Sequence, residues 1–292
     1  MSGFTSWKPR KHAHQWLIFP ENMGTHLSID EVALSQGELY TIVTNKKAKG
    51  KKGSLIGIIS GTKTEEVIEH LSKIDYNKRL SVKEITLDMA NSMKLIAKKS
   101  FPKATQVTDR FHVQKLALEA LQEIRIKHRW IAMNQENKDI AEAKSKGKTY
   151  RQELLTNGDS VKQLLARSRY LLYKPSSKWT ITQQERAQLL FELYPDIKRA
   201  YGLNQRLRNI YNNNNDKSVA ITKLAHWYRE VEESGFENFN IITNTITVNY
   251  QSILNYFDNR STNASAESFN SKIKLFRTQF SGVRKVDFFL FR

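Results

Sequence analysis

The chain has no cysteine among its 292 residues. This absence excludes disulfide bonds, thiol catalysis and zinc sites built on cysteine, so any bound metal has to be held by oxygen ligands or histidine. Acidic residues are in the minority, with 29 Asp and Glu against 47 Lys and Arg and a formal net charge of +18. Because basic residues recur along the whole chain, the excess favours a nucleic acid partner over a merely soluble basic surface.

Long apolar runs are also lacking. No stretch approaches the roughly 18 apolar residues that a membrane helix needs, and the segment Met1 to Arg10 has no apolar core like that of a signal peptide. We therefore expect no membrane partner and a cytoplasmic, nucleoid-associated protein. With 39% hydrophobic residues, the chain can bury a substantial core in one large domain or two smaller ones.

The N-terminal part of the sequence has the pattern of an α/β fold. A basic lead over residues 1–25, which we interpret as a linker or arm, precedes three runs with strand character that are separated by Gly37 and by a loop rich in Lys and Gly over residues 46–53. A helix begins at the capping-box spacing of Thr62 and Glu65. The predicted strands are Leu27 to Leu34, Leu39 to Asn45, Ser54 to Ser60, Val82 to Leu87 and Thr105 to Thr108, with a second helix over Asn91 to Ser100.

Three strands, a helix, a strand, a helix and a strand is the element order of a ribonuclease H-like core. The later strands then lie parallel, because crossover helices connect them. The pattern of residues 26–112 therefore predicts the first part of this core, with a mixed five-stranded sheet.

The sequence between residues 113 and 250 changes to long helical periodicities with no convincing strand. Polar turns interrupt it at Lys146 to Lys148, Pro175 to Lys178 and Asn212 to Asp216, which favours a large all-helical insertion. In the remaining segment, residues 251–292, one amphipathic helix over Ser261 to Phe280 completes the core. Its apolar stripe is formed by Phe269, Ile273, Phe276 and Phe280.

Three acidic residues far apart in the chain are candidates for one metal site. Asp30 lies within the first predicted strand, where a charged side chain needs a partner or a metal, although strand alternation also allows it to face solvent. Asp88 follows the fourth predicted strand, at the end where open α/β sheets place ligands. The alternative is that it caps the next helix, a role for which Asn91 is equally suited. Glu267 alone is typical of a solvated helical charge. Together the three carboxylates suit two divalent ions that carry out phosphoryl transfer.

Two motifs resemble those of bacterial insertion-sequence DDE transposases, the ISL-three family among them. The first motif is Asp109-Arg110-Phe111-His112 followed by Val113, and the second runs from Asn263 to Asn270, with Lys272 and Lys274 after it. The resemblance extends from about Leu27 to the C-terminus. Further short matches are Leu87-Asp88-Met89, Phe101-Pro102-Lys103-Ala104, Tyr194-Pro195 and Ile253-Leu254-Asn255-Tyr256-Phe257.

The resemblance implies a transposase that hydrolyses DNA at the transposon ends and then joins the freed 3′-hydroxyl to target DNA. Asp30, Asp88 and Glu267 correspond to its catalytic, metal-binding acids, and the cofactor would be two Mg²⁺ or Mn²⁺ ions. Asp109 and His112 correspond to a signature that supports the site. Their spacing allows the carboxylate to orient the imidazole, and it equally fits a packed histidine beside an Asp helix cap.

Several residues are candidates for DNA contacts. Asn263, Lys272, Lys274 and Arg277 lie on or next to the helix of Glu267, where basic groups can neutralise phosphates, and Asn270 can donate to a phosphate oxygen in support of the site. Each also fits an ordinary solvated face. Trp227 in the helical insertion can stack on an unpaired base, or it belongs to the core of that insertion.

Related transposases carry an N-terminal region that reads the transposon ends, and fewer than about 30 residues precede Asp30 here, too few for a helix-turn-helix domain. We expect a separate DNA-binding polypeptide to supply this recognition, or the chain to be a truncated product, and a homo-oligomer to form in the synaptic complex. Two alternatives stay open. One is a non-catalytic DNA-binding remnant, and the other is a ribonuclease H-like structure-specific nuclease that cuts without joining.

Overall fold

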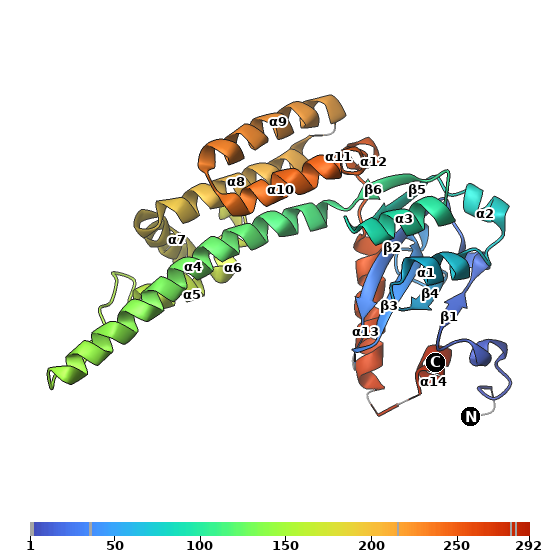
Figure 1. The fold of residues 1–292 in the computed structure, drawn as a ribbon, viewed down its shortest axis with the longest axis horizontal. Helices are drawn as coiled ribbons and strands as arrows, with labels where there is room; N and C mark the ends of the chain where they lie inside the picture. The colour runs from blue at the N-terminus through green and yellow to red at the C-terminus, as the bar shows by residue number, and fades with distance from the viewer. Residues whose placement is uncertain (1–2, 35–36, 215, 281, 284) are drawn as a thin grey trace. The chain divides into compact units, whose positions relative to one another are not determined.

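The computed structural model describes residues 3–34, 37–214, 216–280, 282–283 and 285–292. The chain divides into two compact units (Figure 1). The first, here called the sheet unit, consists of Met1–His112 and Asn249–Arg292, and the second, the helical unit, consists of Val113–Val248. Within the described ranges, no helix is both long enough and apolar enough to cross a membrane.

A six-stranded mixed sheet forms the centre of the sheet unit within the described residues, in the order β1-β4-β3-β2-β5-β6. The first four strands in this order pair antiparallel, whereas β2 pairs with β5 and β5 with β6 in parallel. The strands are β1 Trp16–Ile18, β2 His26–Ala33, β3 Leu39–Asn45, β4 Leu55–Ser60, β5 Glu84–Leu87 and β6 Thr105–Thr108. The predicted α/β class is thereby confirmed.

The prediction of five strands is wrong, because the lead segment supplies one more. Three of its residues form β1, which pairs antiparallel with β4 so that Trp16 lies opposite Ile59. Leu17 is only 3% exposed and packs in the core. Three residues are too few to show strand alternation, so the sequence alone suggested a linker there.

Helices connect the parallel strands of the sheet unit, and further helices come after the last strand in the sequence. Between β4 and β5 lie α1 Thr64–Leu71 and α2 Tyr76–Leu80, and α3 Asn91–Ser100 lies between β5 and β6. The predicted capping box of Thr62 and Glu65 does not form. The residue before α1 is Lys63, and no side chain caps the start of this helix. The C-terminal helices are α11 Tyr250–Leu254, α12 Tyr256–Asn259, α13 Ala264–Gln279 and α14 Val286–Phe291, and short 3-10 turns cover Lys8–Lys11, Pro20–Asn22 and Lys46–Ala48.

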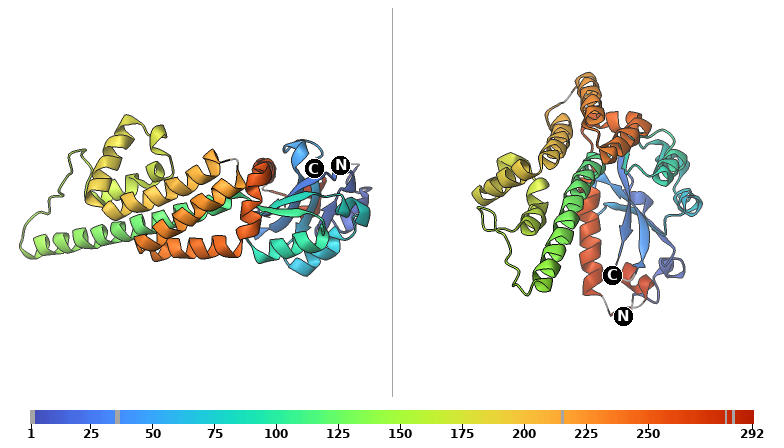
Figure 2. Two further views of the ribbon diagram at one scale, coloured as in Figure 1. Left: turned by 90° about the horizontal axis from the view of Figure 1, so that it is seen from above. Right: turned by 60° about the vertical axis from the view of Figure 1, so that its left-hand side comes forward.

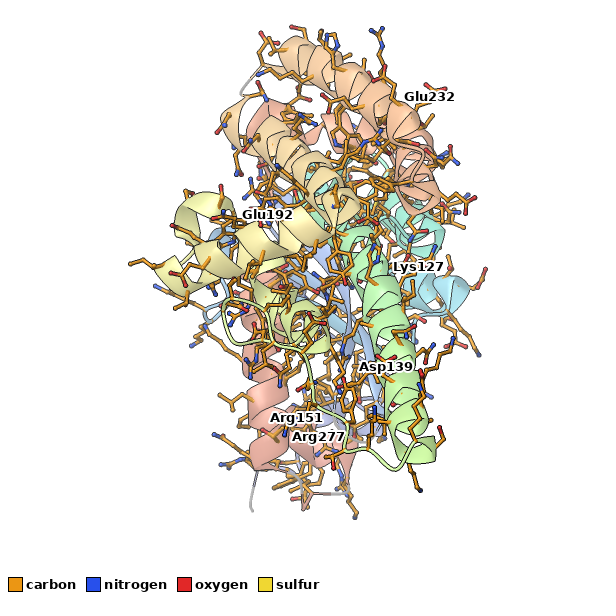
Figure 3. The ribbon with its side chains drawn as sticks, turned by 90° about the vertical axis from the view of Figure 1, so that its left-hand side faces the viewer. Lys127, Asp139, Arg151, Glu192, Glu232 and Arg277 are labelled. Atoms are coloured by element: carbon orange, nitrogen blue, oxygen red, sulfur yellow. The ribbon has the colours of Figure 1, made fainter. Side chains whose placement is uncertain are left out.

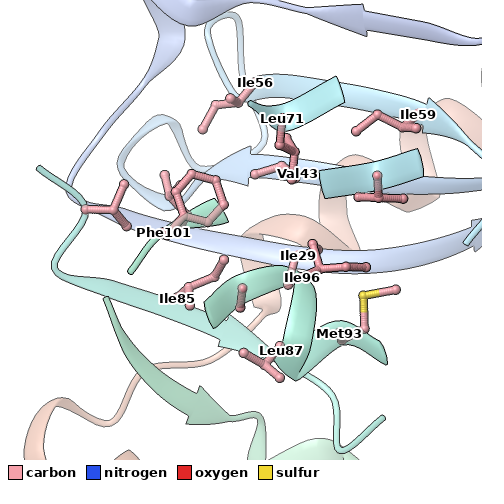
Figure 4. Packing of buried hydrophobic residues seen from close by; sticks show 14 of the residues in the cluster. Ile29, Val43, Ile56, Ile59, Leu71, Ile85, Leu87, Met93, Ile96 and Phe101 are labelled. Atoms are coloured by element: carbon pink, nitrogen blue, oxygen red, sulfur yellow. The ribbon is translucent and has the colours of Figure 1, made fainter. Parts of the chain in front are cut away.

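Apolar clusters cover both faces of the sheet. On one face, Ile29 of β2 packs with Leu71 of α1 and Ile96 of α3 (Figure 4). Leu27 of β2 belongs to the same cluster. On the other face, Val32 of β2 packs with the apolar stripe of α13 that was predicted from the sequence, Phe269, Ile273, Phe276 and Phe280. Since side chains alternate along a strand, Asp30 belongs to the face covered by α13.

The helical unit contains no strand in the part of the chain that the structure describes, as the periodicity predicted. Its helices are α4 Arg110–Ser145, α5 Val161–Arg167, α6 Arg169–Leu172, α7 Ile181–Leu193, α8 Pro195–Asn213, α9 Lys217–Ser234 and α10 Glu237–Val248. The 3-10 turn Ser176–Lys178 lies between α6 and α7, and the first turn of α4 belongs to the sheet unit. In sequence order α7, α8, α9 and α10 pack against one another (Figure 2). Charged side chains are exposed on several helices of the unit, such as Lys127 on α4, Glu192 on α7 and Glu232 on α9 (Figure 3).

Candidate active site

Asp30 is held on the face of the sheet that α13 covers. The amide of Asn270 donates to its Oδ2 at 2.7 Å, and the backbone N–H of Glu31 donates to its Oδ1 at 2.9 Å. The alternative of a free, solvent-facing Asp30 is therefore wrong. Burial raises the pKa of Asp30, and the neighbouring Asp88 adds to this rise, while the Glu31 N–H and the nearby His112 oppose it.

Asp88 follows β5 directly and does not cap the next helix. Its Oδ1 accepts the backbone N–H of Ala90 at 2.9 Å, which closes a tight turn. Ala90 is the residue before α3 and provides no side-chain cap, and Asn91 is already the first helical residue. The capping alternative for Asp88 and Asn91 is therefore wrong, and the Asp88 carboxylate keeps one oxygen without a hydrogen bond among the described residues.

The register of the parallel strands brings three carboxylates to one level. Ser28 of β2 lies opposite Thr86 of β5, so continuing the register by two residues sets Asp30 opposite Asp88. Leu87 of β5 lies opposite Thr108 of β6, so one further residue sets Asp88 opposite Asp109. Asp88 and Asp109 directly follow the carboxyl ends of β5 and β6, the edge where open sheets bind ligands, and Asp30 lies within β2 at the same level.

Glu267 comes to the same place from the first turn of α13. Partial burial raises its pKa, Asp109 and Asp30 raise it further, and His112 lowers it. The Glu267 side chain is exposed, and no ion pair or hydrogen bond to its carboxylate occurs within the described ranges. Asp109 and Asp30 thus lie close enough to Glu267 for their negative charges to disfavour its ionised form.

The sequence of the chain matches a family of known proteins. A family model described as a transposase, DDE_Tnp_ISL3, matches residues 27–292. The chain belongs to this transposase family. The resemblance drawn from its motifs is thus confirmed, and membership implies a DNA-processing activity that acts on an insertion sequence. No curated protein and no solved structure matches the chain.

Asp109 of this transposase connects two helices and does not orient His112. It is 2% exposed, its Oδ1 accepts the N–H of Phe111 in the first turn of α4, and its Oδ2 accepts the N–H of Asn263, both at 3.1 Å. The predicted carboxylate–imidazole contact is therefore wrong, and the helix-capping alternative describes the residue correctly. Because Asn263 comes immediately before α13, Asp109 fixes the start of the helix that carries Glu267.

The two asparagines of the second motif are buried. Asn263 is 1% exposed, so its predicted role in surface contacts with DNA is wrong, and both polar atoms of its amide lack a partner in the described structure. Asn270 is 7% exposed and donates to Asp30 in place of the predicted phosphate. Its Oδ1 also has no partner. Unpaired buried amides beside carboxylates indicate a site that binds water or a ligand.

A buried polar network lies beneath the start of α13, and the sequence did not reveal it. The Lys46 ammonium donates to Thr86 Oγ1 at 2.7 Å and to Ser261 Oγ, and it lies 3.4 Å from Glu84 Oε1. Asn259 donates to Glu84 Oε2 at 3.1 Å. The network ties the segment before α13 to β5. A signal was present in Glu84, a charged residue at the start of a strand buried on both faces.

Two further predicted DNA-binding residues, in addition to Asn263, belong to the interior. Arg277 is 0% exposed and is bound by Glu38, so its predicted contact with a phosphate is wrong. Trp227 is 1% exposed and its indole N–H donates to Leu203 O at 2.8 Å within the helical unit, so stacking on a base is wrong and the core alternative is correct. Lys272 and Lys274 are exposed, and their contact with DNA stays a prediction.

Within the described residues, no group of three or more His, Asp or Glu side chains is already in position to share one metal ion. The donor set nevertheless fits a hard divalent cation. All candidate ligands are oxygen atoms, the pKa values of Asp30 and Glu267 are raised by burial and by neighbouring carboxylates, and the Oδ1 of Asn270 is unpaired. DDE transposases as a class use divalent metals, and these residues are compatible with that requirement.

Proposed function

We propose that this chain is the catalytic part of a DDE transposase, which cleaves DNA at the ends of an insertion sequence and joins those ends to target DNA. Asp30, Asp88 and Glu267 would hold two Mg²⁺ or Mn²⁺ ions. The observation that carries the proposal is the register of β2 and β5, which sets Asp30 level with Asp88 on adjacent parallel strands while the first turn of α13 presents Glu267 to them.

The sheet supports a ribonuclease H-like core as the fold of this enzyme. Three antiparallel strands followed by two parallel strands with crossover helices have the order expected for it, and β1 is an addition at the edge. In this proposal, residues 26–112 and 251–292 make the core, residues 113–250 are a helical insertion, and residues 1–25 are a lead that adds β1.

Bound divalent ions would activate the attacking oxygen and stabilise the leaving oxygen at the scissile phosphate. The chain's own residues prepare the site for them. Asn270 and the Glu31 N–H fix the orientation of the Asp30 carboxylate, and Asp109 fixes the entry of α13 and thereby the position of Glu267. A carboxylate whose orientation is already fixed, as that of Asp30 is, needs less reorganisation when it binds a metal ion.

The positive charge of the chain supports DNA as the partner, both as transposon ends and as target. Exposed Lys274 on α13 is available for phosphate contacts on the same helix as Glu267. We further propose that a homo-oligomer forms the synaptic complex and that a separate polypeptide contributes to recognition of the ends.

The proposal is tested by cleavage and strand transfer on a labelled duplex carrying the element's terminal repeats, with Mg²⁺ or Mn²⁺. Asp88→Asn and Glu267→Gln should bind the duplex as the wild type does and neither cut nor join it. Glu65 is an exposed carboxylate on α1, away from the site. Glu65→Gln removes the same charge there, and this variant should cleave and join the duplex as the wild type does.

Each other outcome decides against a part of the proposal. Cleavage that survives in both site variants would show that these acids are not the catalytic set. A wild type that cuts but never joins would be a structure-specific nuclease, and a wild type that binds without cutting under any condition would be a DNA-binding remnant.

A further inference from the structure

The loop between β3 and β4 carries an unusual density of positive charge. Residues 46–53 read Lys-Lys-Ala-Lys-Gly-Lys-Lys-Gly, and we call this segment the lysine loop. Four of its lysines are exposed: Lys47, Lys49, Lys51 and Lys52. In the described part of the chain none of these four forms an ion pair, so their charge is not neutralised within the protein.

The lysine loop is fastened to the turn of α13 that carries Glu267. Gly50 is buried there, with a φ of +70°, and a Cβ at this position would lie 3.3 Å from both Ser265 O and Ser268 Oγ. Lys272 donates to Gly50 O at 2.9 Å. Ser265 and Ser268 flank Glu267 in the sequence, so the tip of the loop rests directly on the turn that positions this acid.

The start of the lysine loop is fixed as well. Lys46 is held by Thr86 and Ser261 in the buried network beneath α13. Lys49 ends the 3-10 turn Lys46–Ala48 in a left-handed conformation with φ 51°, which is uncommon for a residue with a side chain, and its backbone N–H donates to Lys46 O at 3.1 Å. A loop that served only to be solvated would need none of these attachments.

Several unneutralised ammonium groups on a loop that is attached next to a carboxylate site have the chemistry to bind a phosphate backbone. Lysines release counterions when they contact phosphates, so such a group attracts a nucleic acid strand irrespective of its sequence. The carboxylates of the site repel the same strand. A positive element beside them offsets this repulsion and brings the scissile phosphate close to the acids.

We propose that the lysine loop binds the phosphate backbone of the DNA strand that enters the acidic site, and that its contact with α13 sets the distance between this strand and Glu267. The inference rests on the proposed function in taking DNA as the partner. Its test measures DNA binding alone and needs no cleavage.

The experiment uses the full chain with Glu267→Gln, without divalent metal, and a labelled DNA duplex at several salt concentrations. In the loop variant, Lys47, Lys49, Lys51 and Lys52 are all replaced by Gln. If the loop makes two or three phosphate contacts, the slope of log affinity against log salt should fall by about 2–3, and affinity at about 0.1 M salt should fall by roughly 10²-fold.

The matched control replaces four exposed lysines elsewhere in the sheet unit by Gln: Lys83, Lys98, Lys99 and Lys103. This variant loses the same net charge and should keep the salt slope of the parent. Equal losses in both variants would mean that only net charge matters, and an unchanged slope in the loop variant would mean that the loop does not contact DNA. Either result overturns the proposal.

A second readout is possible because the chain has no cysteine. Lys51→Cys creates a unique thiol that can carry a photo-crosslinker, and Lys99→Cys on α3 is the control. Crosslinking to DNA from position 51 and not from position 99 is expected, and the reverse would contradict the loop as a DNA contact. If position 51 crosslinks to DNA while the wild-type chain never cleaves DNA with Mg²⁺ or Mn²⁺, the loop contact stands and the proposed function fails, so the two failures are distinguishable.

Discussion

Replacing Arg277 by Gln should destabilise the sheet unit and leave DNA affinity unchanged. Its guanidinium is completely buried and makes four hydrogen bonds. Two go to the Glu38 carboxylate, at 2.9 and 2.6 Å, and the others go to Phe280 O at 3.3 Å and Val283 O at 3.0 Å. These bonds join the end of α13 and the segment after it to the start of β3.

The cost of the substitution follows from what it leaves behind. The Glu38 side chain is only 15% exposed, so without Arg277 it becomes a largely buried carboxylate with no counter-charge. Breaking a buried ion pair by removing one partner costs about 3–5 kcal/mol. Since domains of this size are stabilised by only about 5–15 kcal/mol, the melting temperature should fall by roughly 10 °C.

Urea unfolding followed by circular dichroism measures this loss, and Arg277→Gln should shift the midpoint with little change in slope. Arg277→Lys keeps the charge but cannot form the paired hydrogen bonds, so it should also be destabilised. Lys274→Gln on the same helix is the control, and as an exposed substitution it should change stability by less than about 0.5 kcal/mol.

The double variant Arg277→Met with Glu38→Leu should recover much of the lost stability, because no buried charge is left unpaired. An Arg277→Gln protein with an unchanged midpoint and weaker DNA binding would refute the reasoning. Arg277 would then be the DNA contact that its neighbourhood on α13 first suggested.

Three further predictions concern the other charged groups. Asp159 is 1% exposed, and although burial acts to raise its pKa, the bound Arg167 and Arg186 lower it. Asp159→Asn should lower the free energy of unfolding by about 3 kcal/mol at neutral pH. In the wild type, urea or thermal unfolding should show the loss of this stabilisation as the pH falls below about 4. Asp109→Asn should reduce cleavage at unchanged DNA affinity and should speed hydrogen exchange of the Asn263 amide, whereas normal exchange would show that the amide does not depend on Asp109. Burial raises the pKa of Asp30, so the charged form is disfavoured in the folded state; the melting temperature of metal-free protein should therefore rise as pH falls from 7 through that raised pKa, and Asp30→Asn should flatten this part of the profile.

The core elements of the sheet unit could be predicted from the sequence because local patterns define them. The bounds of β3, β6 and α3 agree with the prediction, since each combines a clear periodicity with a clear end. β1 could not be found in this way, because its three residues become a strand only by pairing with β4. The acids could be named from their residue types and motifs, and the strand register that sets Asp30 level with Asp88 required the structure.

Interior positions on helices were the main source of error, although the sequence contained a signal for two of them. Arg277 follows Ile273 by four residues and so lies along the apolar stripe of α13. Trp227 continues a stripe with Ala220, Leu224 and Val231 on α9. The partner of Asp109 could not be predicted, because the Asn263 N–H comes from a segment far along the chain and only the tertiary fold brings it there.

The most direct test of the proposed metal site is anomalous diffraction from crystals of the wild-type protein soaked in Mn²⁺, with Asp88→Asn crystals as the control. We expect anomalous peaks bonded to the carboxylates of Asp30, Asp88 and Glu267, and their loss or marked weakening in the variant. Peaks confined to other carboxylates, or peaks at the site that are unchanged in Asp88→Asn, would contradict the assignment of these three acids as the metal ligands of this transposase.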